Sequence, residues 1–506
     1  MKLAHHTFEF RKWLCRTLAT REQIKLQTKL MLAVSIFVIS FCVKSLHAVD
    51  LEPLINTPEQ PGEGMSSEFD ARATAITKGE GILFATVHDP SETVILSHAP
   101  GYSIFMSVVY VTLGRNYFTV QLIQNAINSL SPVLLFLIAG NLLSWRVGVA
   151  AGIIAAVSHH LSYYSNLILS DSLCPLPILI AVYILVKARF NGGGSWTSYV
   201  AAGCMLGLSA WIRPNPMLLG VFCGVTLILL SGTRKRVLAK AALLALTSLL
   251  VIVPIPIRNY VLYGAFVPIQ LGVGLNLWEG LADVSDGRFG ARTDEEAMLQ
   301  EVEKYGNSRY GESWATPDGI MRDRDRLRKS LAVIADRPVW FVGAMFRRIP
   351  EILKDSAYAP LVFRGTDTKL RDTVELLREA NQTKKTRRLQ VEQPMSQAPL
   401  VIGNNLSWLR TPARAVQRIT KETGLLFALI GLAILLFGSP RRALFLLMVP
   451  VYYLMFQSII HTEFRYTLAI RYFFVVFAAV VWTILITLLI RALRTGVSRI
   501  KTGLNA

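Results

Sequence analysis

The chain has 506 residues, of which 52% are hydrophobic and only 17% are charged, whereas soluble domains carry about 25% charged residues. Its formal net charge is +19, and apolar runs long enough to cross a bilayer recur from Met31 to Ile490. These features exclude an ordinary soluble enzyme and predict a multi-span membrane protein. Most short basic clusters lie at the ends of apolar runs, so the positive charge indicates topology and not a nucleic-acid partner.

The first apolar run, residues 30–49, follows a basic N-terminal segment. Residues 1–30 hold seven Lys or Arg residues against two Glu residues, which predicts that the N-terminus faces the cytoplasm. Many further spans follow this run, so we expect a retained first span and not a signal peptide. The five Cys residues cannot all pair, and four of them lie in or beside apolar stretches, so we expect no disulfide framework.

Ten apolar runs can cross a bilayer as helices. They are residues 30–49, 119–143, 147–167, 173–190, 197–212, 215–231, 238–257, 423–438, 443–460 and 467–490. The predicted fold class is an all-α polytopic membrane protein with about ten transmembrane helices, interfacial helices and a large outer loop. We place it in the cytoplasmic membrane with both termini in the cytoplasm, because the short basic loops then fall inside.

This topology divides the chain into four regions. Residues 1–29 form a cytoplasmic segment, and residues 30–257 form a transmembrane catalytic region that includes a first outer loop at residues 50–118. Residues 258–422 form a long extracytoplasmic loop with interfacial helices. Residues 423–506 form the C-terminal transmembrane helices and a basic cytoplasmic tail.

The first outer loop is acidic in its early part and ends in an apolar stretch, residues 100–113. If this stretch crossed the bilayer, Arg115 would face the cytoplasm and every later assignment would invert, so we expect an interfacial helix. In the long outer loop, residues 339–353 and the more polar residues 370–389 are predicted to form helices that do not span.

Unusual polar residues gather on the predicted outer face. They are Glu68, Asp70, His98, Asp171, Arg213, Arg258, His461, Glu463, Arg465 and Tyr466. Any one of them could be an interfacial anchor. Their convergence from five separate segments favours a functional site.

The two acidic segments each have two interpretations. Asp70 could be a solvated carboxylate, but the helical spacing of Phe69, Ala73 and Ile76 places it at the start of a helix against the membrane. That position suits a general base that faces a membrane-embedded donor. Asp171 could cap the helix that begins near Leu173, or it could be a reactive group.

The arginines and histidines suggest a ligand more than a metal. Arg213 and Arg258 end apolar spans, and a planar guanidinium at the membrane surface suits a lipid phosphate, although a head-group anchor is the alternative. His88, Asp89 and His98 are close in sequence, but no i, i+4 His pair or Cys cluster exists, so we predict no catalytic metal and leave a divalent cation as an open alternative. No nucleotide-binding or hydrolase motif is present.

Taken in chain order, these elements resemble the GT-C membrane glycosyltransferases, especially the bacterial branch similar to protein O-mannosyltransferases and to the lipid A aminoarabinose transferase. The elements are His98-Ala-Pro-Gly-Tyr102, Leu113-Gly114, Leu169-Ser-Asp171, Gly207-Leu…Arg213-Pro214, Arg258-Asn-Tyr260, Asn276-Leu-Trp278 and His461-Thr-Glu463-Phe-Arg465-Tyr466. The resemblance covers most of the chain.

The resemblance implies a polyprenyl-phosphate-linked sugar donor, no nucleotide, and inverting transfer to a glycan, lipid or protein outside the cytoplasm. It implies that Asp70 or Glu68 is the base and that Asp171 supports it; many relatives carry adjacent Asp-Glu where Phe69 separates these two acids. The implied substrate-binding residues are His98, Tyr102, Arg213, Arg258, Asn276, His461, Glu463, Arg465 and Tyr466.

Two other classes of protein stay open at this point. A transporter or flippase of a lipid-linked sugar usually has internal repeats and charges at mid-membrane, whereas the acids of this chain fall in outer loops. A non-catalytic membrane scaffold would tolerate single carboxylate substitutions.

Overall fold

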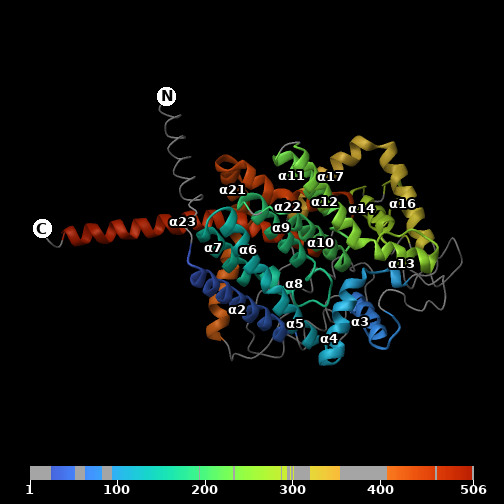
Figure 1. Cartoon of the computed structure of the whole chain (residues 1–506), viewed down its shortest axis with the longest axis horizontal. Helices are drawn as coiled ribbons and strands as arrows, with labels where there is room; N and C mark the ends of the chain where they lie inside the picture. The colour runs from blue at the N-terminus through green and yellow to red at the C-terminus, as the bar shows by residue number, and fades with distance from the viewer. Residues whose placement is uncertain are drawn as a thin grey trace.

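The computed structural model describes residues 24–51, 63–81, 94–192, 194–231, 234–285, 288–292, 297, 300, 319–353, 407–461 and 464–503. Throughout these residues the regular secondary structure is helical, without a β-strand (Figure 1). The longer helices are α2 (Leu26–Leu51), α3 (Glu63–Thr77), α4 (Pro100–Leu113), α5 (Tyr117–Asn128), α6 (Leu130–Leu142), α7 (Trp145–Val157), α9 (Pro175–Phe190), α10 (Trp196–Ile212), α11 (Leu219–Ser231), α12 (Lys235–Ile252), α13 (Pro254–Tyr263), α14 (Val273–Ser285), α16 (Gly319–Asp336), α17 (Pro338–Leu353), α21 (Ser407–Gly438), α22 (Pro440–Ile459) and α23 (Leu468–Gly503). The predicted all-α fold class is confirmed.

Among the described residues, five stretches of helix are long and apolar enough to cross a membrane, which makes the chain a multi-pass membrane protein. They are Leu26–Val49, Tyr117–Leu142, Lys235–Tyr263, Pro440–Ile459 and Arg465–Arg494. A sixth arises if the two arms of α21, Arg410–Lys421 and Thr423–Gly438, form one span across their 53° bend.

The other four predicted spans form helices that are shorter than a full crossing. They are α7, α9, α10 and α11, which have 13 to 17 residues. Ser158 ends α7 because its backbone is not helical (φ −56°, ψ 126°). A short helix, α8 (His159–Tyr164), then leads into irregular chain before α9.

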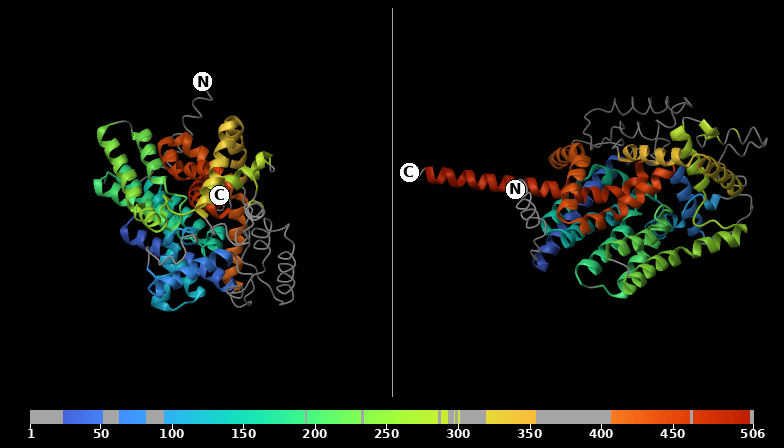
Figure 2. Two further views of the ribbon diagram at one scale, coloured as in Figure 1. Left: turned by 90° about the vertical axis from the view of Figure 1, so that its right-hand side faces the viewer. Right: turned by 90° about the horizontal axis from the view of Figure 1, so that it is seen from above.

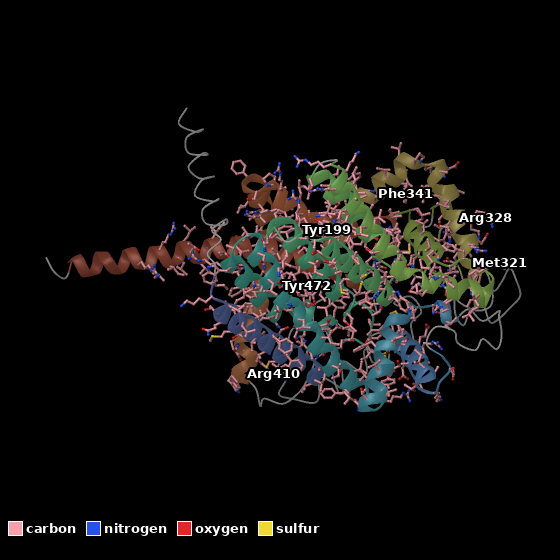
Figure 3. The ribbon with its side chains drawn as sticks, viewed as in Figure 1. Tyr199, Met321, Arg328, Phe341, Arg410 and Tyr472 are labelled. Carbon is pink, nitrogen blue, oxygen red and sulfur yellow. The ribbon has the colours of Figure 1, made fainter. Side chains whose placement is uncertain are left out.

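The core is a bundle in which α6, α7, α9, α10, α22 and α23 pack together. Leu135, Val182 and Phe473 are at most 1% exposed there, and Tyr472 lies in the middle of the molecule (Figure 3). By contrast, Met31 on α2 is 71% exposed, and the last part of α23 extends away from the body (Figure 2). Exposed apolar side chains on these helices suit contact with lipid.

The helices expected to lie outside the bundle are partly described. Residues 100–113 form α4 and residues 339–353 form most of α17, as predicted. Residues 370–389 lie outside the described residues. In Figure 1, α3 and α4 lie together along the lower edge of the molecule, and α3 carries Glu68 and Asp70.

Candidate active site

The helix α3 holds the first pair of acids, and the predicted helical spacing is confirmed. Phe69 and Ala73 are buried, and the Phe69 ring packs edge-on against Tyr102 of α4 with 4.8 Å between ring centroids. The same ring lies 4.5 Å from that of His98. Because Phe69 anchors the helix, Glu68 is held beside His98 before the start of α4, and Asp70 faces Tyr110 near the end of α4.

Asp70 is engaged by two donors. Its Oδ1 accepts a hydrogen bond of 2.6 Å from the Tyr110 hydroxyl and one of 2.9 Å from Arg115 Nε, while Arg115 Nη2 bonds the other oxygen. The side chain of Asp70 is 9% exposed and that of Arg115 is 62% exposed. The hydrogen bond to Asp70 raises the pKa of Arg115, and burial raises the pKa of Tyr110. The Tyr110 hydroxyl and the Arg115 guanidinium therefore hold the Asp70 carboxylate in one orientation.

Glu68 has a different environment. Its Oε2 lies 2.9 Å from His98 Nε2, and its side chain is 43% exposed. The two acids of α3 thus have different environments. Asp70 is buried against a guanidinium, whereas Glu68 is partly exposed at the protein surface.

A glycine brings α4 against the end of α10. A Cβ atom at Gly101 would lie 2.6 Å from the Trp211 carbonyl oxygen, so only glycine permits this approach without a shift. Tyr102 therefore lies at the junction that also carries Arg213, and its hydroxyl donates to Gln124 Oε1 at 2.8 Å. Burial raises the pKa of Tyr102, and the charge of Asp171 adds to this effect.

Asp171 pairs with Arg213 and does not cap a helix. The residue at the N-cap of α9 is Cys174, which makes no side-chain capping bond, so the capping interpretation is wrong. Asp171 is 3% exposed and its Oδ2 contacts Arg213 Nη1 directly. Irregular chain between α8 and α9 frees this acid from a capping position and turns it towards α10.

Tyr466 joins two arginines from distant segments. The Arg213 guanidinium lies over its ring at 4.2 Å from the centroid, and that of Arg465 lies at 5.2 Å. Arg465 Nη1 is also 3.3 Å from Met65 Sδ on α3. Since Met65 precedes Asp70 by five residues, the helix separates them by about 7.5 Å along its axis. Arg213, with its partner Asp171, and Arg465 therefore meet at Tyr466, and Arg465 connects this group to the helix that carries Asp70.

The remaining predicted residues form two further groups. Arg258 is 1% exposed and its Nε donates to Asn259 Oδ1 at 2.8 Å. The backbone nitrogen of His461 donates to the Asn276 carbonyl at 2.7 Å. Glu463 lies outside the described residues.

Sequence reasoning missed the partners of several predicted residues. Arg115 and Tyr110 hold Asp70, and Asp283 lies 2.7 Å from His461 Nδ1 and 3.2 Å from Arg348 Nη2. Burial lowers the pKa of Arg348. No short-range pattern links these pairs, because the contacts join residues 40 to 178 positions apart.

Within the described ranges, no three His, Cys, Asp or Glu side chains meet in a way that could hold a metal ion. His88 and Asp89, which were considered as possible metal ligands on the basis of the sequence, lie outside those ranges. The geometry of the described site is instead that of paired carboxylates and guanidinium groups around tyrosines.

Comparison with known proteins gives a family for part of this region. Residues 97–257, which include His98, Tyr102, Asp171 and Arg213, match the family described as dolichyl-phosphate-mannose-protein mannosyltransferase. The matched region therefore resembles a family of GT-C membrane glycosyltransferases. The match is shorter than half of the chain, and no curated protein matches the sequence.

Solved structures give weaker likenesses. The archaeal oligosaccharyltransferase AglB from Archaeoglobus fulgidus, in complex with an inhibitory peptide and a dolichol-phosphate, is 14% identical with a TM-score of 0.48 over 92% of this chain and 52% of that one. The apo form of the Archaeoglobus fulgidus oligosaccharyltransferase is 13% identical with a TM-score of 0.49, over 92% of this chain and 52% of its own. This chain thus spans about half the length of these proteins.

Proposed function

We propose that this protein is an inverting glycosyltransferase that moves a sugar from a polyprenyl-phosphate donor to an acceptor outside the cytoplasm. The observation that carries the proposal is that the Asp171–Arg213 pair meets Arg465 at the ring of Tyr466, and that Arg465 also contacts α3, the helix that carries Asp70. Such a site combines a group that can take a proton with groups that can receive a phosphate.

In this proposal the arginines bind the donor phosphate. Arg213 and Arg465 flank Tyr466, whose ring orients both guanidinium groups. As the bond between the anomeric carbon and the phosphate oxygen breaks, negative charge grows on the phosphate, and two fixed cations stabilise it. Asp171 fixes Arg213 and moderates its charge before the donor binds.

In this proposal one of the two acids of α3 acts as the general base. The acceptor hydroxyl forms the new bond to the anomeric carbon and loses its proton to a carboxylate. We propose Asp70 for this role: Arg115 is largely exposed and can release one carboxylate oxygen, while Tyr110 keeps the other in place. Glu68, paired with His98, is the alternative base.

The rest of the proposal concerns placement. We propose that both termini lie in the cytoplasm and that the site faces away from it, because the basic inner loops require that orientation. The outer region 258–422 would then shape the acceptor site. Its described part contacts the C-terminal region 423–506 through the hydrogen bond from the His461 backbone nitrogen to the Asn276 carbonyl.

The test is transfer from a panel of radiolabelled polyprenyl-phosphate sugars, in membranes that carry wild type, Asp70→Asn or Asp171→Asn at matched expression. We expect Asp70→Asn to lose transfer by about 10²-fold or more while the donor still binds, because general-base groups contribute about 10²–10⁴-fold. Asp325→Asn, which removes a surface acid paired with Lys329, is the matched control and should keep full activity.

Two results would contradict the proposal. If both Asp70→Asn and Glu68→Gln transferred sugar at the wild-type rate, neither acid would be the general base. Absence of transfer by wild type, combined with movement of labelled lipid across vesicles, would favour a carrier.

A further inference from the structure

Two helices of the region 258–422, α14 and α17, lie against the segment that carries Arg465 and Tyr466 (Figure 1). This segment leads from the end of α22 through the short 3-10 helix η7 (Phe464–Thr467) to the start of α23. In the proposed function Arg465 binds the donor phosphate, and its guanidinium lies 5.2 Å from the centroid of the Tyr466 ring. Contacts that fix the segment therefore help to place the groups that bind the phosphate.

One face of α14 is fitted to His461. Asn276, Gly280 and Asp283 are spaced by four and three residues, so they lie on the same face of the helix. The Asn276 carbonyl accepts from the His461 backbone nitrogen at 2.7 Å, and Asp283 Oδ2 lies 2.7 Å from His461 Nδ1. A Cβ atom at Gly280 would lie 2.6 Å from the same backbone nitrogen. Three positions of this face thus approach a single residue of the neighbouring segment.

Arg348 of α17 connects the same carboxylate to the end of α22. Its Nη2 donates to Asp283 Oδ2 at 3.2 Å, and its Nη1 donates to the Ser458 carbonyl at 3.4 Å. The Arg348 side chain is 11% exposed, so water competes little for these bonds. Beyond η7, Arg471 Nη1 donates to the Leu353 carbonyl of α17 at 3.4 Å. Helix α17 therefore contacts the chain both before and after η7.

His461 is close enough to η7 to influence its position. Three steps along the chain separate His461 from Phe464, so their Cα atoms are at most about 11 Å apart. Each residue has only two soft backbone dihedrals. A rotation of the chain at His461 would therefore displace Arg465 and Tyr466, which follow Phe464 directly.

We propose that Asp283 is a positioning residue for sugar transfer, which acts through His461 on Arg465 and Tyr466. The inference rests on the proposed function and deepens it, because it gives the region 258–422 a part in binding the donor phosphate. A misplacement of about 1 Å can reduce a catalysed rate about 10²-fold even when the substitution is far from the chemistry. Arg348 serves the same purpose by holding Asp283 against the end of α22.

A double-mutant cycle tests whether Asp283 acts through Arg465. The measured quantity is kcat/KM for the polyprenyl-phosphate sugar donor in wild type, Asp283→Asn, Arg465→Gln and the double variant. We expect Asp283→Asn to lower kcat/KM about tenfold when Arg465 is present and less than about twofold when Arg465 is already replaced, because effects within one network are not additive. A role confined to stability would reduce the amount of active enzyme equally in both backgrounds. Asp283→Glu, which keeps the charge, should recover part of the loss.

Amide hydrogen exchange of the full chain in detergent gives a second readout, which needs no sugar transfer. Peptides that cover residues 460–467 should exchange faster in Asp283→Asn than in wild type, whereas peptides from α5 should exchange at the wild-type rate. Arg348→Gln removes a contact of Asp283 and serves if Asp283→Asn does not fold; it should show the same pattern. Asp325→Asn, which removes a surface acid of α16 paired with Lys329, is the control and should leave residues 460–467 unchanged.

Two results would overturn the inference. One is an equal loss of kcat/KM on replacing Asp283 in the presence and absence of Arg465. The other is unchanged exchange of residues 460–467 in Asp283→Asn. Absence of transfer by wild type would instead contradict the proposed function, and the exchange measurement would still show whether Asp283 holds the segment.

Discussion

The contact between α4 and α10 gives a prediction whose size follows from the structure. In Gly101→Ala, the new Cβ atom would lie 2.6 Å from the Trp211 carbonyl oxygen and 2.8 Å from its carbon. Ordinary contact begins at 3.4 Å, so the two helices must separate by about 0.8 Å, and the obstructing atoms are backbone that cannot rotate away.

The expected cost combines two terms of opposite sign. Overpacking of this kind costs about 1–3 kcal/mol, whereas Ala in place of Gly gains up to about 1 kcal/mol in a helix. The net destabilisation should be about 1–2 kcal/mol. The shift also moves Tyr102 relative to Arg213, so transfer should fall by more than the loss of folded protein explains.

The assay compares apparent Tm and transfer rate of purified Gly101→Ala with those of Gly140→Ala. Gly140 is also in an apolar helix, but its nearest Cβ contact would be 3.9 Å away, so Ala should be neutral or slightly stabilising there. If Gly101→Ala were as stable and active as the Gly140 control, the close approach that positions Tyr102 would not exist.

Three further substitutions test the contacts around the site. Arg115→Gln should lower kcat by about ten- to a hundredfold with donor binding retained, because Asp70 loses a side chain that orients it and small misplacements of a catalytic group cost about 10²-fold. An unchanged kcat would show that Arg115 has no part in the mechanism. Tyr466→Leu should raise the KM for the lipid donor about two- to tenfold, as expected for lost cation–π contacts, and a pure kcat effect would contradict this. Asp283→Asn should destabilise the protein by about 1–2 kcal/mol in thermal unfolding, since His461 and Arg348 share that carboxylate; an unchanged Tm would refute the shared pair.

Local patterns predicted the helices but not their partners. The spacing of Phe69, Ala73 and Ile76 predicts α3 because a helix repeats every 3.6 residues and one face must be buried. The charge argument that kept residues 100–113 out of the bilayer is consistent with the short helix α4. Neither pattern contains information on a partner 40 residues away, which is why Tyr110 and Arg115 were missed.

The lengths of the individual membrane helices could not be predicted from local sequence patterns either. Hydropathy does not register the backbone of Ser158 or the 53° bend of α21, because both depend on what the chain packs against. Asp171 shows the same limit. An acid followed by an apolar run beginning with proline is typical of a cap, yet Arg213, 42 residues later, determines its position.

Adjacent residues of α5 connect the candidate site to α2. Gln124 accepts from Tyr102 and donates to the carbonyls of Ser165 and Leu167. Asn125 donates to the Lys44 carbonyl of α2 and to Asn166 Oδ1. Side chains at successive helical positions point about 100° apart, so one turn of α5 bonds both segments. Because these amides are buried, replacing Gln124 or Asn125 by an apolar residue would leave their partners unsatisfied, at a cost of about 1–3 kcal/mol for each group.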